Sequence, residues 1–225
     1  MILEPISPIV TGPIVSPIVQ SFVSEYVISW EAIWLFLKIT AVIVASILIT
    51  LLLDRSMNKT GFVTNKALTL ILSSAMALGL SLRYGLSVYT FQGMFLYFLL
   101  LYASMSDLTD RHVADHISIS ILALSLISVP TVGFTSMLIG GAVTAAMQIG
   151  VSMFSEGRYG GADWKIASSC AFLLGWTRGI AGLVLGLLIG IIFTLIYNKV
   201  KDRDQGEGFV LVPFLSIGMM AMFFV

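Results

Sequence analysis

Cysteine, histidine and charged residues are scarce in this chain of 225 residues. The single cysteine, Cys170, excludes a disulfide within the chain and a zinc site built from several cysteines. The two histidines, His112 and His116, are too few for a metal cluster that depends on histidine. Dinucleotide-binding, phosphate-loop and nucleic-acid-binding motifs are also absent. The sequence therefore predicts no metal, no cofactor and no nucleic-acid partner.

Hydrophobic residues make up 58% of the chain and charged residues only 11%, whereas soluble domains carry about 25% charged residues. Runs of about 20 apolar residues recur along nearly its whole length, which is typical of helices that cross a lipid bilayer. Such runs must satisfy their backbone hydrogen bonds internally, and the alternation expected of barrel strands is missing. The composition therefore predicts an all-α, polytopic membrane protein.

About eight apolar segments can be distinguished. The sixth is short, so it is either re-entrant or covered by its neighbours. The loops are short, and consecutive helices should therefore be antiparallel neighbours in one helical bundle of about eight transmembrane helices. We expect the helices at about residues 30–53, 66–82, 88–106, 116–132, 135–154, 164–177, 179–199 and 209–225.

Residues 1–29 differ from the rest of the chain. Pro-Ile-Val occurs three times in this stretch, beginning at Pro8, Pro13 and Pro17, and prolines at this spacing oppose a continuous helix. The stretch contains no lysine or arginine, so it lacks the basic start of a secretory signal peptide. We expect an irregular, partly interfacial arm over 1–29 and a single transmembrane domain over 30–225.

Lysine and arginine predict the orientation of the helices. In an eight-span arrangement, nine of the 12 basic residues fall on one side, which the positive-inside rule assigns to the cytoplasm. Only Arg83 and Arg178 fall on the opposite side, and Lys38 lies within the first span. We therefore expect a multi-pass protein of the cytoplasmic membrane with both termini outside the cytoplasm. The nine residues are Arg55, Lys59, Lys66, Arg111, Arg158, Lys165, Lys199, Lys201 and Arg203.

Glycines are dense in the later segments, and Gly182, Gly186 and Gly190 form one GxxxGxxxG stripe. Small residues at this spacing let helices approach closely in lipid. The stripe favours packing within the bundle over self-association, and it leaves the oligomeric state open.

Two aspartates fall at the predicted cytoplasmic edge of the membrane. Asp107 ends the third apolar segment, and Asp163 follows Gly160 and Gly161 just before the sixth. Charges beside lipid-spanning helices are costly and usually functional. Two carboxylates that meet across a bundle can share their protons unequally, which is the arrangement that an aspartic protease needs.

Each aspartate also has a structural interpretation. Asp107 can be a helix-end charge that reaches interfacial water, and Asp163 can cap the helix that follows it. Asp110, three residues after Asp107, is an alternative first aspartate if the helix continues. Asp115 and His116 are expected to cap or flank the fourth helix.

The residues around the two aspartates resemble the type IV prepilin peptidases and the related archaeal preflagellin peptidases, which are membrane aspartic proteases. The run DLTDRHVAD at 107–115 is similar to the first aspartate motif of this family, and GGADWK at 160–165 is similar to its second, a Gly-x-Gly-Asp-x-Lys loop. Two membrane spans separate the motifs, as in the family. The run VPFLSIG at 212–218 is similar to the segment that opens the family's last helix. The resemblance covers about residues 90–225.

The resemblance implies a peptidase that cleaves prepilin-like precursors, such as type IV pilins, pseudopilins or archaellins, at the cytoplasmic face. Cleavage would separate a short basic leader from a hydrophobic helix. One aspartate would activate water and the other would polarise the carbonyl or protonate the leaving amine, and their roles stay open because a close pair titrates as a unit. The catalytic pair would be Asp107 and Asp163, with Gly160, Gly161, Ala162 and Lys165 as the supporting loop and Arg111 and Pro213 as further supporting residues.

Three features depart from the family pattern. Ala114 stands where the family usually has proline, and Ala162 stands where the loop motif has glycine. Loop 54–65 contains no cysteine and is far too short for the four-cysteine zinc domain that many bacterial members carry. We therefore expect a minimal peptidase without N-methyltransferase activity.

Two other functions are compatible with the sequence. A small transporter or channel could use Asp107 and Asp163 for protons or cations, but it would favour charges near the bilayer midplane and broken helices in paired repeats. The other is a catalytically inactive partner in a pilus or secretion assembly, against which the presence of both aspartates argues. The sequence does not determine the substrate, the cleavage-site preference or a bacterial or archaeal source.

Overall fold

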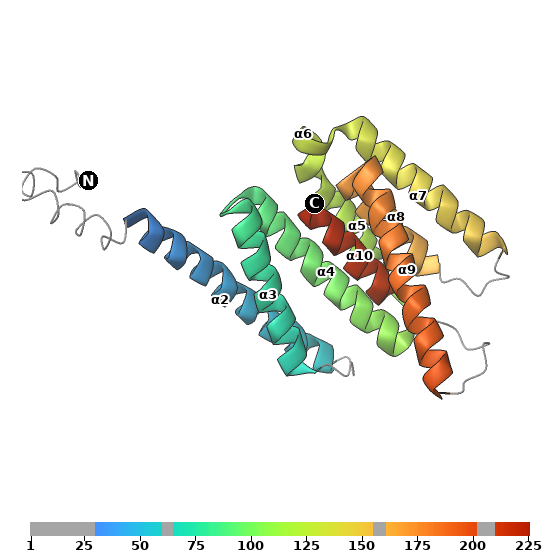
Figure 1. Ribbon diagram of the computed structural model, residues 1–225, viewed down its shortest axis with the longest axis horizontal. Helices are drawn as coiled ribbons and strands as arrows, with labels where there is room; N and C mark the ends of the chain where they lie inside the picture. Colours follow the sequence, from blue (N-terminus) through green and yellow to red (C-terminus); the bar gives the residue numbers. More distant parts are fainter. Residues whose placement is uncertain (1–29, 60–64, 155–160, 202–209) are drawn as a thin grey trace, which may run out of the picture.

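The computed structural model of the protein describes residues 30–59, 65–154, 161–201 and 210–225. The arm predicted over residues 1–29 lies outside this part of the chain. Within the described residues all regular elements are helices, which confirms the predicted all-α class (Figure 1). The elements are α2 (Trp30–Lys59), α3 (Lys66–Tyr84), α4 (Val88–Asp110), α5 (Asp115–Ser125), η1 (Leu126–Ser128), α6 (Val129–Val132), α7 (Phe134–Phe154), α8 (Gly161–Leu174), α9 (Trp176–Lys201) and α10 (Val212–Phe224).

Each of the eight predicted apolar segments has a helical counterpart, and α5, η1 and α6 together form the fourth. Six of the described segments are long and apolar enough to cross a membrane, whereas α8 and α10 are not among them. With 14 and 13 residues, α8 and α10 span only about 20 Å, less than the roughly 30 Å of a hydrocarbon core. The sixth segment is thus short, as predicted, and the last is shorter than expected.

The fourth segment is interrupted near its end. A 3₁₀ turn over Leu126–Ser128 separates α5 from the single turn of α6. Pro130 has no backbone N–H and cannot continue an α-helical hydrogen-bond ladder, so the chain changes its helix type here and turns at Gly133, which has a φ of 80°.

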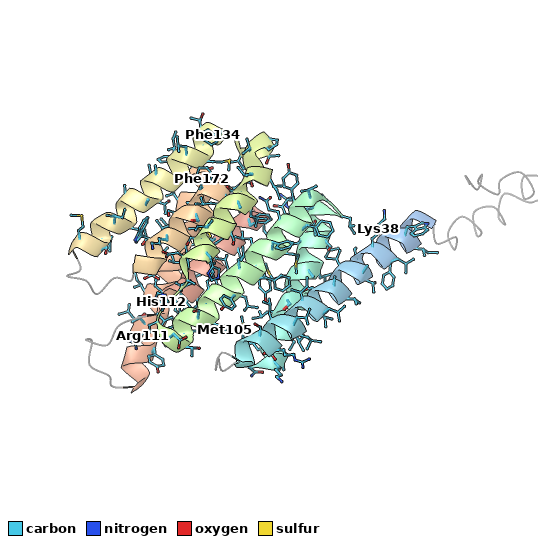
Figure 2. All side chains as sticks on the ribbon, turned by 180° about the vertical axis from the view of Figure 1, so that it is seen from behind. Lys38, Met105, Arg111, His112, Phe134 and Phe172 are labelled. Carbon is cyan, nitrogen blue, oxygen red and sulfur yellow. The ribbon has the colours of Figure 1, made fainter. Side chains whose placement is uncertain are left out.

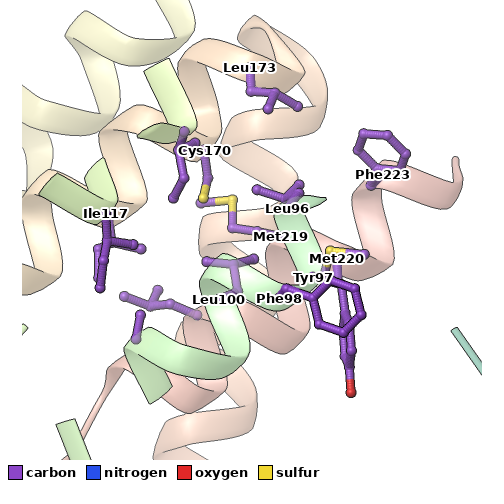
Figure 3. Close-up of a cluster of buried hydrophobic side chains, with 14 of the residues drawn as sticks. Leu96, Tyr97, Phe98, Leu100, Ile117, Cys170, Leu173, Met219, Met220 and Phe223 are labelled. Carbon is purple, nitrogen blue, oxygen red and sulfur yellow. The ribbon is translucent and has the colours of Figure 1, made fainter. Parts of the chain in front are cut away.

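Helix α4 lies at the centre of the molecule. Figure 1 shows α2 and α3 on one side of α4, and α5 to α10 on the other. Helix α10 packs against α4, α8 and α9, and α5 packs against α4 and α8. The side chains that fill the space between these helices are apolar, and Figure 3 shows Leu100 of α4, Ile117 of α5, Cys170 of α8 and Met219 of α10 in one cluster. This core determines how the ends of α4, α8 and α10 are placed relative to one another.

Glycine allows α9 and α10 to approach unusually closely. A Cβ atom on Gly218 would lie 2.3 Å from the carbonyl oxygen of Gly182 and 2.5 Å from the backbone nitrogen of Gly186. Gly182 and Gly186 in turn face the α10 backbone near Met219 and Leu215. Packing within the bundle, predicted from the glycine stripe, is confirmed for these two glycines.

Candidate functional site

Several helix termini meet at one end of the bundle. Figure 2 shows Met105, Arg111 and His112 at this end and Phe134 and Phe172 at the opposite end. Helix α4 ends here at Asp110, and α5, α8 and α10 begin here, as the contacts described below demonstrate. We call this region the aspartate end.

Asp107 lies in the last turn of α4, and it is only 8% exposed. Its Oδ2 atom accepts a hydrogen bond from the backbone N–H of Val212, at 3.2 Å, so the first residue of α10 contacts the carboxylate directly. Arg111 adds a favourable Coulomb interaction with the same carboxylate. Asp107 is therefore a buried acid with a defined donor, which differs from a helix-end charge that simply reaches water.

The connection from α4 to α5 is held close to Asp107. Arg111 adopts a left-handed conformation, with a φ of 52°, and its backbone N–H donates to the carbonyl of Asp107 at 3.1 Å, which ends the helix. The Ser106 hydroxyl donates to the carbonyl of His112 at 2.6 Å, and Val113 is buried. These contacts fold the segment after Asp107 back against α4.

Asp163 is 7% exposed and lies in the first turn of α8. The helix begins at Gly161, two residues earlier, so Asp163 lies inside the helix rather than at the capping position before it. A negative charge in the first turn is stabilised by the helix dipole. Gly161 and Ala162 form the start of the helix, and Gly160 falls outside the described residues.

Lys165 pairs with an aspartate outside the predicted catalytic pair. Its Nζ atom lies 2.7 Å from Oδ1 of Asp115, the first residue of α5. This ion pair connects the beginnings of α5 and α8, and it places the segment that follows Asp107 beside the turn that carries Asp163. Asp115 thus flanks the start of the fourth segment, as predicted, and it also supports the arrangement of the two motifs.

The structure separates the two candidates for the first aspartate by their surroundings. Asp110 is exposed at the end of α4, whereas Asp107 is buried against α10. Helices α4 and α8 share α5 and α10 as neighbours, so the aspartate-bearing ends lie around the same two helices. Burial and these contacts favour Asp107, and the direct pairing of its carboxylate with Asp163 stays a prediction.

Sequence reasoning missed two contacts at this end, those of Val212 with Asp107 and of Asp115 with Lys165. The residues of the first lie 105 positions apart in the chain, and those of the second 50 positions apart. The only hint of the contact between Val212 and Asp107 was the similarity of the VPF run at 212–214 to a segment of the family. Among the described residues, no group of three or more His, Cys, Asp or Glu side chains could hold a metal ion.

Comparison with known proteins agrees with the motifs. No curated protein and no solved structure matches the chain. Residues 94–195, somewhat less than half of the chain, match a protein family described as the type IV leader peptidase family. This segment runs from α4 into α9 and contains both Asp107 and Asp163. The resemblance inferred from the two aspartate motifs is therefore confirmed: residues 94–195 identify this polytopic helical protein as similar to the type IV leader peptidases.

Proposed function

We propose that this protein is an aspartic endopeptidase that removes a short basic leader from prepilin-like precursors, with Asp107 and Asp163 as its catalytic pair. The observation that carries the proposal is the burial of both aspartates at helix ends inside the segment that matches the leader peptidase family. Buried carboxylates are costly and are retained where they perform chemistry or are well paired. An alternative role of Asp110 is disfavoured because its side chain is exposed.

The proposed reaction is hydrolysis by general acid–base catalysis. One ionised aspartate takes a proton from a water molecule, and the resulting hydroxide attacks the carbonyl carbon of the scissile peptide bond. The other aspartate, protonated, donates its proton to the carbonyl oxygen. The first aspartate then passes the proton that it took from water to the leaving amine as the C–N bond breaks. As the carbonyl re-forms, a hydroxyl of the tetrahedral intermediate returns its proton to the second aspartate, so that both aspartates regain their starting states and neither a cofactor nor a metal enters the balance.

The position of the aspartates suits such a substrate. A precursor with a basic leader followed by an apolar helix has its scissile bond where the membrane surface meets the hydrocarbon region. Asp107 lies at the end of an apolar helix of 23 residues and Asp163 lies at the beginning of α8, so both are available at such a boundary. The lysine and arginine bias assigns this end to the cytoplasm.

An apolar groove beside α4 supports docking of the substrate's hydrophobic helix. The groove has a volume of about 410 Å³ and lies between α2, α4 and α5. Its α4 wall runs from Phe91 to Tyr102 and stops five residues, or about 8 Å along the axis, before Asp107. His116 lies at the α5 wall, near the aspartate end. An apolar segment in this groove would lead its polar leader towards Asp107.

The test is a cleavage assay with purified protein in lipid and candidate precursors that carry a basic leader and an apolar helix. The wild type should release the leader, and both Asp107→Asn and Asp163→Asn should lose at least about 1,000-fold in rate, since a carboxamide cannot transfer the proton. Asp110→Asn is the matched control and should retain activity. If cleavage survives Asp107→Asn and is lost in Asp110→Asn, the first catalytic aspartate is Asp110 and the assignment of Asp107 is wrong. A folded wild type that cleaves none of the precursors would favour transport or an inactive structural role.

A further inference from the structure

The first turn of α10 directs one backbone donor at Asp107. Pro213, the second residue of the helix, has no N–H, and the N–H groups of Phe214 and Leu215 both bond to the carbonyl of Leu211, at 3.1 Å. The N–H of Val212 is thus the donor of this turn that points out of the helix, and it bonds to Oδ2 of Asp107. The residue before the helix, Leu211, has no side chain that could cap it.

This contact lies in a buried environment and involves an acidic acceptor. A hydrogen bond to an ionised carboxylate is about twice as strong as one between neutral groups, and it is stronger again where water is excluded. The positive end of the α10 dipole acts in the same direction. The contact therefore restricts the orientation of the Asp107 carboxylate.

The far end of α10 is held by Arg83 and Arg178, the two arginines that the sequence predicts outside the cytoplasm. Arg83 donates through Nε to the carbonyl oxygen of Phe224, and Arg178 donates through a guanidinium nitrogen to the backbone oxygen of Val225, each at 3.2 Å. The hydroxyl of Tyr84 donates to the carbonyl of Phe223. These bonds occupy carbonyl groups that the last turn of a helix leaves without partners.

The middle of α10 is held as well, because Gly218 lies directly against the backbone of α9 at Gly182 and Gly186. A helix that is seated on a neighbour in its middle and bonded at its far end has little freedom to slide along its axis. Its first residue, Val212, is therefore presented to Asp107 in a defined position.

From these contacts we propose that α10 is a positioning element of the site, and that the backbone N–H of Val212 holds the carboxylate of Asp107 in the orientation that proton transfer requires. Pro213 contributes by removing a second donor from the same turn, so that the carboxylate has a single partner on α10. This inference rests on the proposed function, because the orientation of Asp107 affects cleavage only if Asp107 belongs to the catalytic pair. A purely structural alternative is that Asp107 serves only to cap α10.

The test removes this N–H alone. Valine at position 212 is replaced by its α-hydroxy acid through nonsense suppression, which turns the peptide bond into an ester and leaves the side chain unchanged. The matched control is the same replacement at Ile217, which is exposed in the middle of α10 and whose N–H belongs to the ordinary helix ladder. Cleavage kinetics and the unfolding temperature are measured for both proteins and for the wild type.

We expect the ester at position 212 to lower kcat by about tenfold or more relative to the ester at 217, with KM changed less than about twofold. The two ester proteins should unfold at similar temperatures. Equal kcat values in the two ester proteins would overturn the positioning role, and so would a loss of kcat that only accompanies a lower unfolding temperature at 212.

The aspartate variants distinguish failure of the positioning role of Val212 from failure of the proposed peptidase activity. If the wild type is active and Asp107→Asn is inactive, equal kcat values for the esters refute the positioning role and leave the peptidase intact. If Asp107→Asn retains full activity, the proposed catalytic pair is wrong, and the role of Val212 is refuted with it.

Discussion

Gly218→Ala is expected to disturb the candidate site from about 9 Å away along α10, because six residues separate position 218 from Val212. The new Cβ would lie 2.3 Å from the carbonyl oxygen of Gly182 and 2.8 Å from the Cα of Gly186, and ordinary contact begins at 3.4 Å. The difference, 3.4 − 2.3, is 1.1 Å, and both obstacles are backbone, so α9 and α10 must separate by about 1 Å. Helix α10 also packs on α4, so the 3.2 Å contact with Asp107 cannot remain unchanged.

The substitution is expected to lower both the stability of the protein and its cleavage rate. Overpacking of this kind costs about 1–3 kcal/mol of stability, and a misplacement of about 1 Å at a catalytic group lowers the rate by up to about 100-fold. The assay is the initial rate of leader cleavage at saturating precursor, combined with thermal unfolding in the same lipid or detergent. We expect Gly218→Ala to stay folded at the assay temperature and to lose about 10- to 100-fold in kcat.

Two other glycines serve as controls of graded severity. A Cβ on Gly150 would meet nothing within 4 Å, so Gly150→Ala should keep wild-type activity. A Cβ on Gly79 would meet only the ring of Phe224, at 3.2 Å, and a ring can yield where backbone cannot. The kcat of Gly79→Ala should therefore lie between those of Gly150→Ala and Gly218→Ala. A folded Gly218→Ala protein with wild-type kcat would refute the link between the seating of α10 and the geometry of the site.

Three further predictions concern other contacts. Replacing Lys165 or Asp115 by alanine should leave the unfolding temperature nearly unchanged, because their ion pair is largely exposed, and a double-mutant cycle with a large coupling energy would contradict this. Arg178→Gln should lower the unfolding temperature, because it removes the hydrogen bond that holds the end of α10 at Val225. The membrane topology, measured by protease accessibility of the loops, should stay unchanged, and an inverted topology would show that Arg178 acts through charge placement instead. Ala45→Trp should fill the apolar groove and raise KM for the precursor severalfold with kcat retained, and an unchanged KM would remove the groove from the substrate path.

Local information was sufficient for the helices. A lipid-exposed backbone must form its own hydrogen bonds, so an apolar run of sufficient length becomes a helix whatever its neighbours are. For this reason the predicted segments agree with the structure to within a few residues at most ends. The larger differences have local causes: α2 continues to Lys59 through a polar stretch, and the fourth segment changes its helix type before Pro130.

The aspartate motifs were also visible in the sequence, because Asp107 and Asp163 stand at the ends of apolar runs and beside recognisable turns. The surroundings of these residues were not visible. The partner of Lys165 is Asp115, and the donor to Asp107 is Val212, and both contacts depend on which helix ends meet. Hydropathy and spacing describe one helix at a time, so they carry no information on such pairs.

The sequence by itself determined the helical class, the apolar segments, the scarcity of metal ligands and the two aspartate motifs, since each depends on residues near one another in the chain. Only the tertiary structure decided that Asp107 is buried while Asp110 is exposed, and that α10 is seated on α9 through Gly218. The physical reason is that burial and close approach depend on the complementary shapes of helices distant in sequence. In lipid, such packing rather than hydrophobicity selects which helices become neighbours.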